Sequence, residues 1–216
     1  MTKEAAIFDF DGTLVDSIDF HFDIHRNVFS EVGINLTRVY FFKECNGMEP
    51  YEFYQKIIHD SKKEPGLIDL VWKAMLREKK RRGLTSIRLY PGVKQMLNTL
   101  KKKGIRMIIA SSSHEGYVNS ILRNNSIREF FDGVVGSDGI KKSKPDPSIF
   151  IKAWKSSGME KDKCIIVEDS INGVNAARRA GIDAICLTTT TNIENIPEYA
   201  LIAERHSDVP NLILGR

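Results

Sequence analysis

Short apolar runs that alternate with helical patterns are the feature that most restricts how this chain can fold. The runs are residues 5–8, 107–110, 164–167 and 184–187. Helical spacing covers residues 91–103, 147–157, 172–180 and 208–214, each followed directly by a glycine. Glycine after a helical segment favours the end of a helix. Buried strands joined by crossover helices form parallel sheets, so the pattern predicts an α/β fold.

Residues 16–88 follow a different pattern, in which apolar residues recur at helical spacing without comparable strand runs. The first set is Phe20, Ile24, Val28 and Val32. Two further helices fit residues 51–59 and 67–82. We expect Ser17 to cap the first helix and Gly33 to end it. The sequence therefore predicts a core domain of residues 1–15 and 89–216 with an all-helical domain, 16–88, inserted into it.

Two aspartates follow the first apolar run directly, in the sequence Asp9-Phe10-Asp11-Gly12-Thr13. The carboxyl ends of the strands are where an open α/β sheet holds its site. An ionised carboxylate at the end of a buried strand needs a cation, a partner or water. One acid can attack a substrate while the other transfers protons. The alternative is a structural turn, since Asp, Gly and Thr all favour the turn before a helix.

Three later polar sites each follow a strand-like run. They are Ser111, Lys144 before Pro145, and the pair Glu168-Asp169. With these motifs in this order, the chain resembles the haloacid dehalogenase superfamily of phosphohydrolases, in particular its branch of β-phosphoglucomutase-like enzymes and sugar-phosphate phosphatases. The resemblance spans nearly the whole chain, and it implies a Rossmann-like parallel-sheet core with an inserted α-helical cap that closes over the phosphate.

The resemblance also implies roles for the acids. Asp9 is expected to be the nucleophile that forms an aspartyl-phosphate, and Asp11 to be the general acid and base. A phosphate monoester repels an anionic nucleophile unless cations neutralise both, and Mg²⁺ suits this role because it prefers oxygen ligands. We expect Asp9, the backbone carbonyl of Asp11 and Asp169 to bind Mg²⁺. Glu168 either coordinates the ion or orders its waters.

The phosphate group itself is expected to contact the loops at the ends of the strands. The residues concerned are Gly12, Ser111, Ser112 and Lys144. The hydroxyl of Ser111 follows a buried strand and would face the phosphoryl oxygens, while the ammonium of Lys144 can bridge Asp9 and phosphate. Ser112 and Ser113 could equally cap a helix that begins near Glu115. Asp138 and Ser170 either brace the acids or serve ordinary turns.

Specificity is expected to come from the inserted helical domain. The candidate substrate contacts there are His21, Gly47, Glu49 and Lys79. The mutase relatives hold a second phosphate with a lysine and an arginine around a cap-loop glycine, where this chain has Asn46 and Pro50. Neither can form a charged phosphate clamp, and this favours hydrolysis over a mutase reaction.

Two other patterns in this domain have competing interpretations. His21 and His25 are four residues apart, as in a metal pair, but with no third ligand nearby an exposed or packed pair is favoured. The basic run of residues 79–82 could bind nucleic acid or a distal anionic group of a substrate. A solvated helix face is the favoured interpretation of this run.

Composition excludes several classes of protein. With 216 residues and 42% hydrophobic content, the chain can bury a good core. Its formal charge of +4, from 32 basic and 28 acidic residues, suits a small anionic partner better than nucleic acid. Three cysteines without Cys-x-x-Cys spacing predict a reducing cytoplasm, and the lack of a run of about 18 apolar residues predicts no membrane span. We also expect a monomer.

The sequence therefore favours a Mg²⁺-dependent phosphatase that acts on a small phosphorylated metabolite, a sugar or polyol phosphate. A β-phosphoglucomutase-like sugar phosphomutase is the second hypothesis. The third is a non-catalytic metal-binding domain that recruits a protein. The set of Asp9, Asp11, Lys144 and Asp169 argues against this third hypothesis, since a purely structural module has no need of mutually repelling acids.

Overall fold

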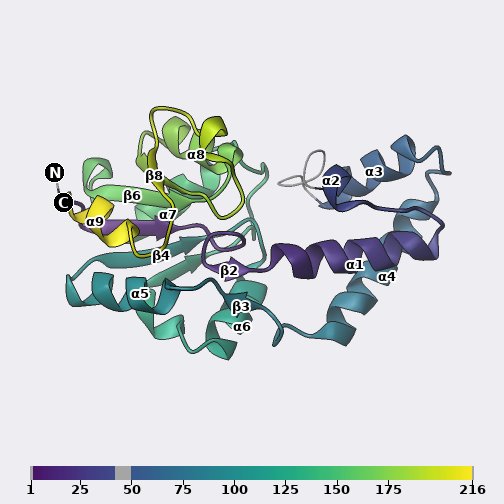
Figure 1. The fold of residues 1–216 in the computed structure, drawn as a ribbon, viewed down its shortest axis with the longest axis horizontal. Coiled ribbons are helices and arrows are strands. Elements are labelled where there is room, and N and C mark those ends of the chain that lie inside the picture. The colour runs from purple at the N-terminus through teal and green to yellow at the C-terminus, as the bar shows by residue number, and fades with distance from the viewer. Residues whose placement is uncertain (1, 42–49, 216) are drawn as a thin grey trace. The chain divides into compact units, whose positions relative to one another are not determined.

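The structure is a computed structural model that describes residues 2–41 and 50–215 and divides into two compact units (Figure 1). The first unit, here called the α/β unit, contains Met1–Asp16 and Arg88–Arg216. The second, the helical unit, contains Ser17–Ile87. The chain thus leaves the α/β unit once and returns to it once.

A six-stranded sheet with all neighbours parallel forms the centre of the α/β unit. In spatial order the strands are β5 (Gly133–Val135), β4 (Arg106–Ala110), β1 (Ala5–Phe8), β6 (Cys164–Glu168), β7 (Asp183–Leu187) and β8 (Leu201–Ala203). The apolar runs became strands because they are buried on both faces: every side chain of β1 is fully buried.

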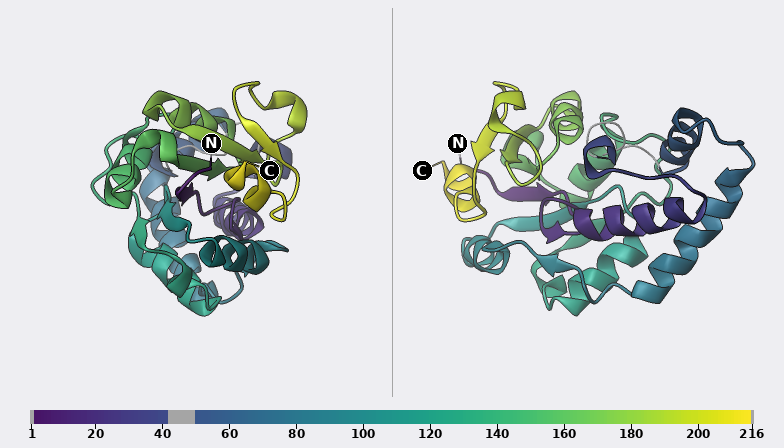
Figure 2. Two further views of the ribbon diagram at one scale, coloured as in Figure 1. Left: turned by 90° about the vertical axis from the view of Figure 1, so that its left-hand side faces the viewer. Right: turned by 45° about the vertical axis from the view of Figure 1, so that its right-hand side comes forward.

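Helices cover both faces of this sheet (Figure 1). They are α5 (Val93–Lys102), α6 (Glu115–Asn124), α7 (Ser148–Ser157), α8 (Ile171–Ala180) and α9 (Val209–Leu214). Short 3₁₀ turns are formed by Arg128–Phe130, Lys161–Lys163 and Ile193–Asn195. Residues of α7 and α8 share one hydrophobic core with β1, β4 and β6. The last helix, α9, lies beside the start of the chain, where the amide of Lys3 donates to the carbonyl of Ile213 (3.1 Å; Figure 2).

The strand order places β1 where the chain reverses direction across the sheet. From β1 the chain proceeds to β4 and β5 on one side, and then crosses to β6, β7 and β8 on the other. The carboxyl ends of strands at such a point form the crevice in which α/β sheets bind ligands. The residues that follow β1, β4 and β6 therefore share one edge of the sheet.

A small antiparallel pair marks the chain's exit from the α/β unit and its return. β2 (Val15–Asp16) pairs with β3 (Arg88–Leu89). The amide of Tyr90 extends this pairing by donating to the carbonyl of Leu14 (3.1 Å). These bonds hold the two crossings of the chain side by side, directly after the segment that carries Asp9 and Asp11.

The helical unit packs around aromatic side chains. Its helices are α1 (Ile18–Glu31), α2 (Arg38–Tyr40), α3 (Pro50–Asp60) and α4 (Leu67–Arg82). Phe29 is fully buried, with ring centroids 5.9 Å from Phe53 and 5.5 Å from Tyr54. His25 lies in the same core, where its Nδ1 is 3.1 Å from the hydroxyl of Tyr54. The packed interpretation of this histidine therefore agrees with its environment.

Several local expectations need correction. Ser17 makes no capping hydrogen bond through its side chain. The helix expected from residue 91 begins at Val93, because Gly92 has a left-handed backbone (φ 88°) that interrupts a right-handed helix. The strands β5 and β8 were not expected at all. Among the described residues, no helix is long and apolar enough to cross a membrane.

Candidate active site

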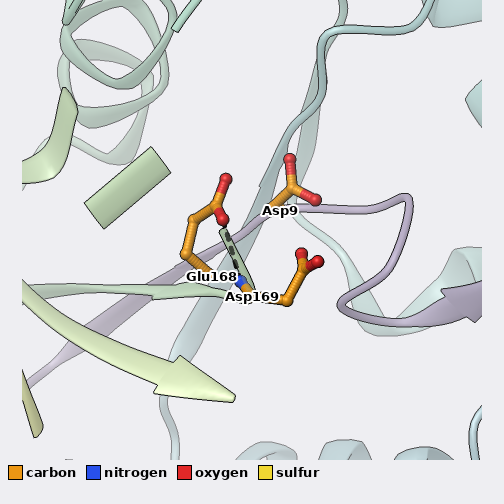
Figure 3. A group of neighbouring side chains, drawn as sticks. All are labelled: Asp9, Glu168 and Asp169. Atoms are coloured by element: carbon orange, nitrogen blue, oxygen red, sulfur yellow. Dashed lines mark hydrogen bonds between the residues drawn. The ribbon is translucent and has the colours of Figure 1, made fainter. Parts of the chain in front are cut away.

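Asp9 directly follows β1 and is held at the carboxyl end of the sheet. Its amide donates to the carbonyl of Val167 on the neighbouring strand β6 (2.8 Å), which extends the parallel pairing by one residue. Only 6% of Asp9 is exposed. Figure 3 shows its carboxyl group beside those of Glu168 and Asp169. The sheet therefore fixes the backbone of Asp9 and leaves its side chain at the edge.

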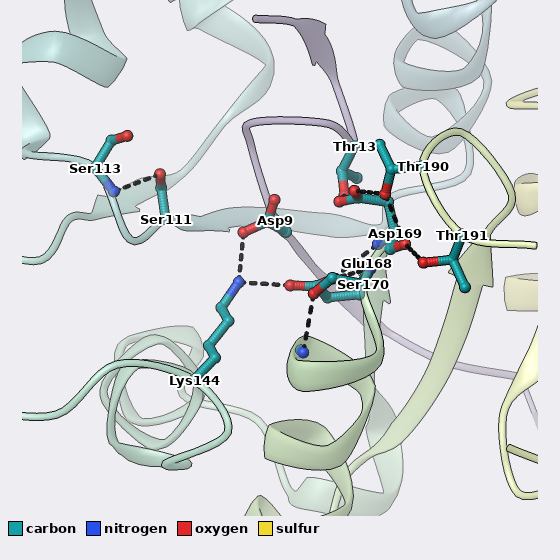
Figure 4. Close-up of polar contacts among 11 residues, drawn as sticks. Asp9, Thr13, Ser111, Ser113, Lys144, Glu168, Asp169, Ser170, Thr190 and Thr191 are labelled. Carbon is teal, nitrogen blue, oxygen red and sulfur yellow. Dashed lines mark hydrogen bonds and ion pairs between the residues drawn. The ribbon is translucent and has the colours of Figure 1, made fainter. Parts of the chain in front are cut away.

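Lys144 lies in the loop before α7 and reaches this group of acids (Figure 4). Its Nζ forms an ion pair with Oδ1 of Asp9 and a second with Oε1 of Glu168, at 2.6 Å. The ammonium also lies 4.6 Å from the centre of the Phe150 ring, within range of a cation–π interaction. One buried cation thus joins two buried carboxylates.

Glu168, the last residue of β6, is held by the start of α8. Its Oε2 accepts hydrogen bonds from the amides of Asp169 (2.8 Å) and Ser170 (2.7 Å) and from the Ser170 hydroxyl (2.9 Å). The same hydroxyl accepts from the amide of Gly173 (3.0 Å), so Ser170 both caps α8 and braces Glu168. A Cβ on Gly173 would lie 1.9 Å from the carboxyl carbon of Glu168, so any larger residue there would displace this carboxyl group.

Asp169 is held by hydroxyl groups from two loops (Figure 4). Its Oδ1 accepts from Thr13 (2.6 Å) and its Oδ2 from Thr190, while its backbone carbonyl accepts from Thr191 (2.6 Å). Gly12 allows the close approach of the first loop, because a Cβ at this position would lie 2.4 Å from Oδ2 of Asp169. Its φ of 91° is also one that side chains rarely adopt.

The charges of this cluster do not balance. Three buried carboxylates face one ammonium, and the candidate ligand atoms of Asp9, Glu168 and Asp169 all lie within 4.8 Å of one another. Burial and the two neighbouring carboxylates hold the pKa of Asp9 well above its usual range, against the opposing charge of Lys144. Burial, and then the charge of Glu168, raises the pKa of Asp169 to about 7. An additional cation would relieve this repulsion.

Burial alone would lower the pKa of Lys144, but the charges of Asp9 and Glu168 outweigh it and raise that pKa. Lys144 therefore keeps its proton. The donors left for a further cation are carboxylate oxygens, the ligands that Mg²⁺ prefers. The residues present thus fit a small divalent cation. The side chain of Asp11 is not part of this cluster, and the ligand expected from that residue is its backbone carbonyl.

Asp11 is bound from the side of α6. Its Oδ2 accepts a hydrogen bond from the hydroxyl of Ser113 (2.7 Å), and its Oδ1 accepts one from the hydroxyl of Tyr117 (3.3 Å). The backbone of Asp11 is held separately, by a bridge to Val15. Its carboxyl group therefore has partners of its own beside the acidic cluster.

The serines after β4 have different environments. Ser111 is fully buried, and its Oγ accepts from the amide of Ser113 (3.0 Å). Ser112 is exposed. The helix α6 begins at Glu115 without a serine cap, and its first amide donates instead to Asp138 (2.8 Å). Of the two roles considered for Asp138, the structure shows the local one at the start of this helix.

The remaining candidates belong to the helical unit or lie outside the described residues. His21 and Lys79 belong to the helical unit and are half-buried there. Gly47 and Glu49 lie outside the described residues, as does Asn46. In the basic run after Lys79, Arg81 and Arg82 both bind the carboxylate of Glu78. The predicted substrate contacts of the helical unit therefore stay predictions.

Sequence reasoning missed several groups that hold these acids. They are Ser113, Tyr117, Thr190, Thr191 and Gly173. A signal existed for the threonines, because four of them, at residues 188–191, directly follow the apolar run of β7. Hydroxyl groups in that position share the sheet edge with the acids after β1 and β6. No comparable signal pointed to Tyr117, which lies inside a helix.

The fold and the site together define a class of α/β protein with carboxylates at the sheet's topological switch point. The profile of the haloacid dehalogenase-like hydrolase family matches residues 6–187. The chain belongs to this family. The predicted family and fold class are thereby confirmed, as is the expectation of an enzyme of this hydrolase family.

Known relatives cover most of the chain. The phosphorylated carbohydrates phosphatase of Thermotoga maritima is 29% identical over 197 residues, 84% of this chain and 83% of the relative. The β-phosphoglucomutase of Bacillus subtilis is 28% identical over 188 residues, 84% and 82% of the two chains. The structure of CbbY from Rhodobacter sphaeroides in complex with phosphate, 23% identical, has a TM-score of 0.83 over 100% of both chains and shows the same fold.

Proposed function

We propose that this protein is a Mg²⁺-dependent phosphatase that hydrolyses a small phosphate monoester through an aspartyl-phosphate on Asp9. The observation that carries this proposal is the buried cluster of Asp9, Glu168 and Asp169 with one lysine, at the switch point of a parallel sheet. A cluster with excess buried negative charge opposes folding unless a cation binds there. Such strained groups are typical of functional sites.

Mg²⁺ would be held by Asp9, Asp169 and the backbone carbonyl of Asp11. When bound, it neutralises charge on the phosphate and on the nucleophile. Oε1 of Glu168 pairs with the ammonium of Lys144 and its Oε2 accepts from two amides and a hydroxyl at the start of α8, whereas the carboxylate oxygens of Asp169 accept from threonine hydroxyls. This favours the second of its two expected roles, in which Glu168 orders the waters of the ion rather than coordinating it. In addition, Glu168 would orient Lys144.

In the first step, a carboxylate oxygen of Asp9 attacks phosphorus and the bond from phosphorus to the leaving oxygen breaks. The leaving oxygen keeps the bonding electron pair and takes a proton from Asp11. In the second step, Asp11 takes a proton from water as that water attacks phosphorus, and Asp9 leaves as a carboxylate. Phosphate and the alcohol are the products, and both acids return to their starting states.

The positively charged and hydroxyl groups would orient the phosphate during both steps. Lys144 is already paired with Asp9 and can share its ammonium with a phosphoryl oxygen. Ser111 is buried at the end of β4, and Gly12 lies in the turn after Asp9. With Ser112, these groups form the proposed phosphate site.

The proposed substrate class is a sugar or polyol phosphate. It rests on relatives such as the phosphorylated carbohydrates phosphatase, together with the mild positive charge of the chain. Similarity to a β-phosphoglucomutase supports a mutase as the second candidate. Asn46 and Pro50, where the mutase relatives have cations, weigh against it. The helical unit is proposed to act as the cap, with His21, Gly47, Glu49 and Lys79 contacting the leaving group.

The test is release of inorganic phosphate from a panel of sugar and polyol phosphates in the presence of Mg²⁺. We expect release from at least one ester, and loss of turnover by more than about a thousandfold in Asp9→Asn, which removes the attacking anion. The matched control is Asp162→Asn, an exposed acid of the same unit that should keep full turnover. Conversion of glucose 1-phosphate to an isomer with little phosphate release would favour the mutase, and full turnover by Asp9→Asn would refute the nucleophile.

A further inference from the structure

Two hydroxyl groups outside the expected motifs bind the carboxyl group that is proposed to move protons. Ser113 donates to one oxygen of Asp11 at 2.7 Å, and Tyr117 donates to the other at 3.3 Å. Asp11 lies in the turn after β1, whereas Ser113 and Tyr117 lie just before and within α6. Along the chain they are 102 and 106 residues from Asp11. All three belong to the α/β unit, so this contact is internal to one compact body.

The segment that supplies both donors, which runs from Ser113 into the first turn of α6, is itself fixed. Asp138 accepts from the amide of Glu115 at 2.8 Å and lies 3.2 Å from Nδ1 of His114. Gly136 lies so close to this turn that a Cβ there would be 2.4 Å from the amide nitrogen of Glu115. The carbonyl of Ser113 accepts from the amide of Ser137 (3.0 Å). The chain between the two hydroxyl residues is therefore tied to the loop after β5.

Ser113 also connects two parts of the proposed site. Its amide donates to Oγ of Ser111 (3.0 Å; Figure 4) while its hydroxyl donates to Asp11. A hydroxyl group can donate to a carboxylate and can accept from a carboxylic acid, because it carries one donor and two lone pairs. The two hydroxyls can therefore keep contact with Asp11 in both of the protonation states that a general acid and base must adopt.

From this geometry we infer that Ser113 and Tyr117 are positioning residues that hold the Asp11 carboxyl group for proton transfer to the leaving oxygen. The inference rests on the proposed function and deepens it. The bond that breaks joins phosphorus to the leaving oxygen, which keeps the electron pair and takes the proton of Asp11. An alkoxide such as that of a sugar leaves poorly without this proton. A 4-nitrophenolate, which is a stable anion, leaves without it.

The test compares these two leaving groups in Ser113→Ala and Tyr117→Phe. The probes are 4-nitrophenyl phosphate and the alkyl phosphate that the wild-type enzyme hydrolyses fastest, and rapid-quench mixing gives the rate of the first leaving-group release. We expect this rate to fall at least about tenfold for the alkyl ester and less than about twofold for the aryl ester, more strongly in Ser113→Ala because its bond is shorter. Asp11 also serves the second step, so both variants should hydrolyse the aspartyl-phosphate slowly. The first equivalent of nitrophenolate should therefore appear as a burst before slower steady-state release.

Matched controls lie nearby and carry the same chemical changes. Ser120→Ala removes a hydroxyl that donates within α6, to the carbonyl of Gly116 (2.8 Å). Tyr199→Phe removes a phenol that binds Asn175, away from the acids. Both controls should keep wild-type rates with both esters. Melting temperatures of all four variants, measured alongside, identify any variant that has lost its fold, and the other variant of the pair then carries the test.

The outcomes separate this inference from the proposed function. A wild-type enzyme that hydrolyses neither ester overturns both. An active wild-type enzyme whose two variants keep their first-step rates, or lose them equally with both esters, overturns only the role of Ser113 and Tyr117. Selective loss with the alkyl ester supports it, because general damage to the site would slow both substrates alike.

Discussion

The α/β unit and the helical unit both bury ionisable side chains, but they surround them differently. Asp9 and Asp169 are 6% and 4% exposed and lie beside a third carboxylate. His25 is 8% exposed and lies among the rings of Phe53 and Tyr54. In the α/β unit, like charges lie close together. In the helical unit, burial lowers the pKa of His25, and its neutral ring packs among other aromatic rings.

The difference indicates that the acid cluster opposes folding of the α/β unit, whereas the aromatic core favours folding of the helical unit. Burying repelling carboxylates opposes folding, and their raised pKa values report that unfavourable free energy. Burying aromatic rings in a close-packed core favours folding. Substitutions should therefore have opposite effects on stability: removing an acid from the cluster should stabilise the metal-free protein, and removing a ring from the helical core should destabilise it.

The largest expected effect is that of Asp169→Asn. We expect turnover to fall by about a thousandfold, about 4 kcal/mol of transition-state stabilisation, because a proposed metal ligand is lost. At pH 8 without Mg²⁺, we expect the free energy of unfolding to rise by about 1–3 kcal/mol, because a buried acid whose pKa is raised to about 7 no longer has to ionise. Phosphate release and urea unfolding measure the two effects.

Mg²⁺ provides the control for this variant. A ligand at about 100 times its dissociation constant stabilises a folded protein by about 2.7 kcal/mol, so Mg²⁺ should raise the melting temperature of the wild-type protein. The same gain is expected for Asp162→Asn, and little gain for Asp169→Asn. A variant that still gained the full stabilisation would remove Asp169 from the metal site, and a less stable metal-free variant would contradict the comparison of the two units.

The next effect is that of Phe29→Ala in the helical unit. Phe29 is fully buried against Phe53 and Tyr54, and deleting a buried phenyl ring costs about 3–5 kcal/mol. Urea unfolding of the full chain should show this loss. Hydrogen exchange should show it in the amides of α1, α3 and α4, with the amides of β1, β4 and β6 retaining their protection.

Leu76→Ala is the matched control for this substitution, because Leu76 lies on α4 and is 51% exposed. We expect a change of less than about 0.5 kcal/mol. Equal loss of protection in the strands and the helices of Phe29→Ala would mean that the two units unfold as one. Their stabilities could then not be contrasted.

The difference between the units also bears on what sequence could predict. The helix of residues 67–82 has the predicted bounds, because glycine precedes and follows its apolar pattern. The strands before Asp9 and Glu168 were predictable because side chains buried on both faces leave a continuous apolar run. β8 also lies in a short apolar run, residues 200–203, but it forms an edge of the sheet, where Leu201 and Ile202 are 46% and 42% exposed, so that run carries no pattern of burial on both faces.

The acids of the site could be predicted, but the groups that hold them could not. Asp9 and Asp169 stand directly after apolar runs, and that position is visible in sequence. Their partners depend on the strand order, which brings β7 beside β6 and places Thr190 against Asp169. Tyr117 meets Asp11 for a similar reason, since β4 lies next to β1 and α6 follows β4. Spacing along the chain carries no record of such contacts.

The smallest expected effect is a difference in the pH dependence of stability. Burial, and then the charges of His21 and Lys79, lowers the pKa of His25 well below its usual value of 6.5. Below about pH 6.5 the unfolded chain therefore binds a proton that the folded chain does not, and stability falls as pH falls, by at most about 1.4 kcal/mol per pH unit. His25→Gln, which can still bond to Tyr54, should remove this contribution between pH 7.5 and 5.

In the α/β unit, stability is expected to change with pH in the opposite direction. The folded-state pKa of Asp169 lies above its usual 3.8, so between about pH 4 and 7 the folded metal-free protein binds more protons than the unfolded chain. Its stability contribution therefore falls as pH rises, and Asp169→Asn should remove that fall. Urea unfolding of both variants across this range measures the two slopes, with His59→Gln, whose side chain is 90% exposed, as control. If the contributions of His25 and Asp169 to the free energy of unfolding changed with pH in the same direction, folding would shift the proton binding of both groups in the same sense. The contrast between the two buried environments would then be wrong.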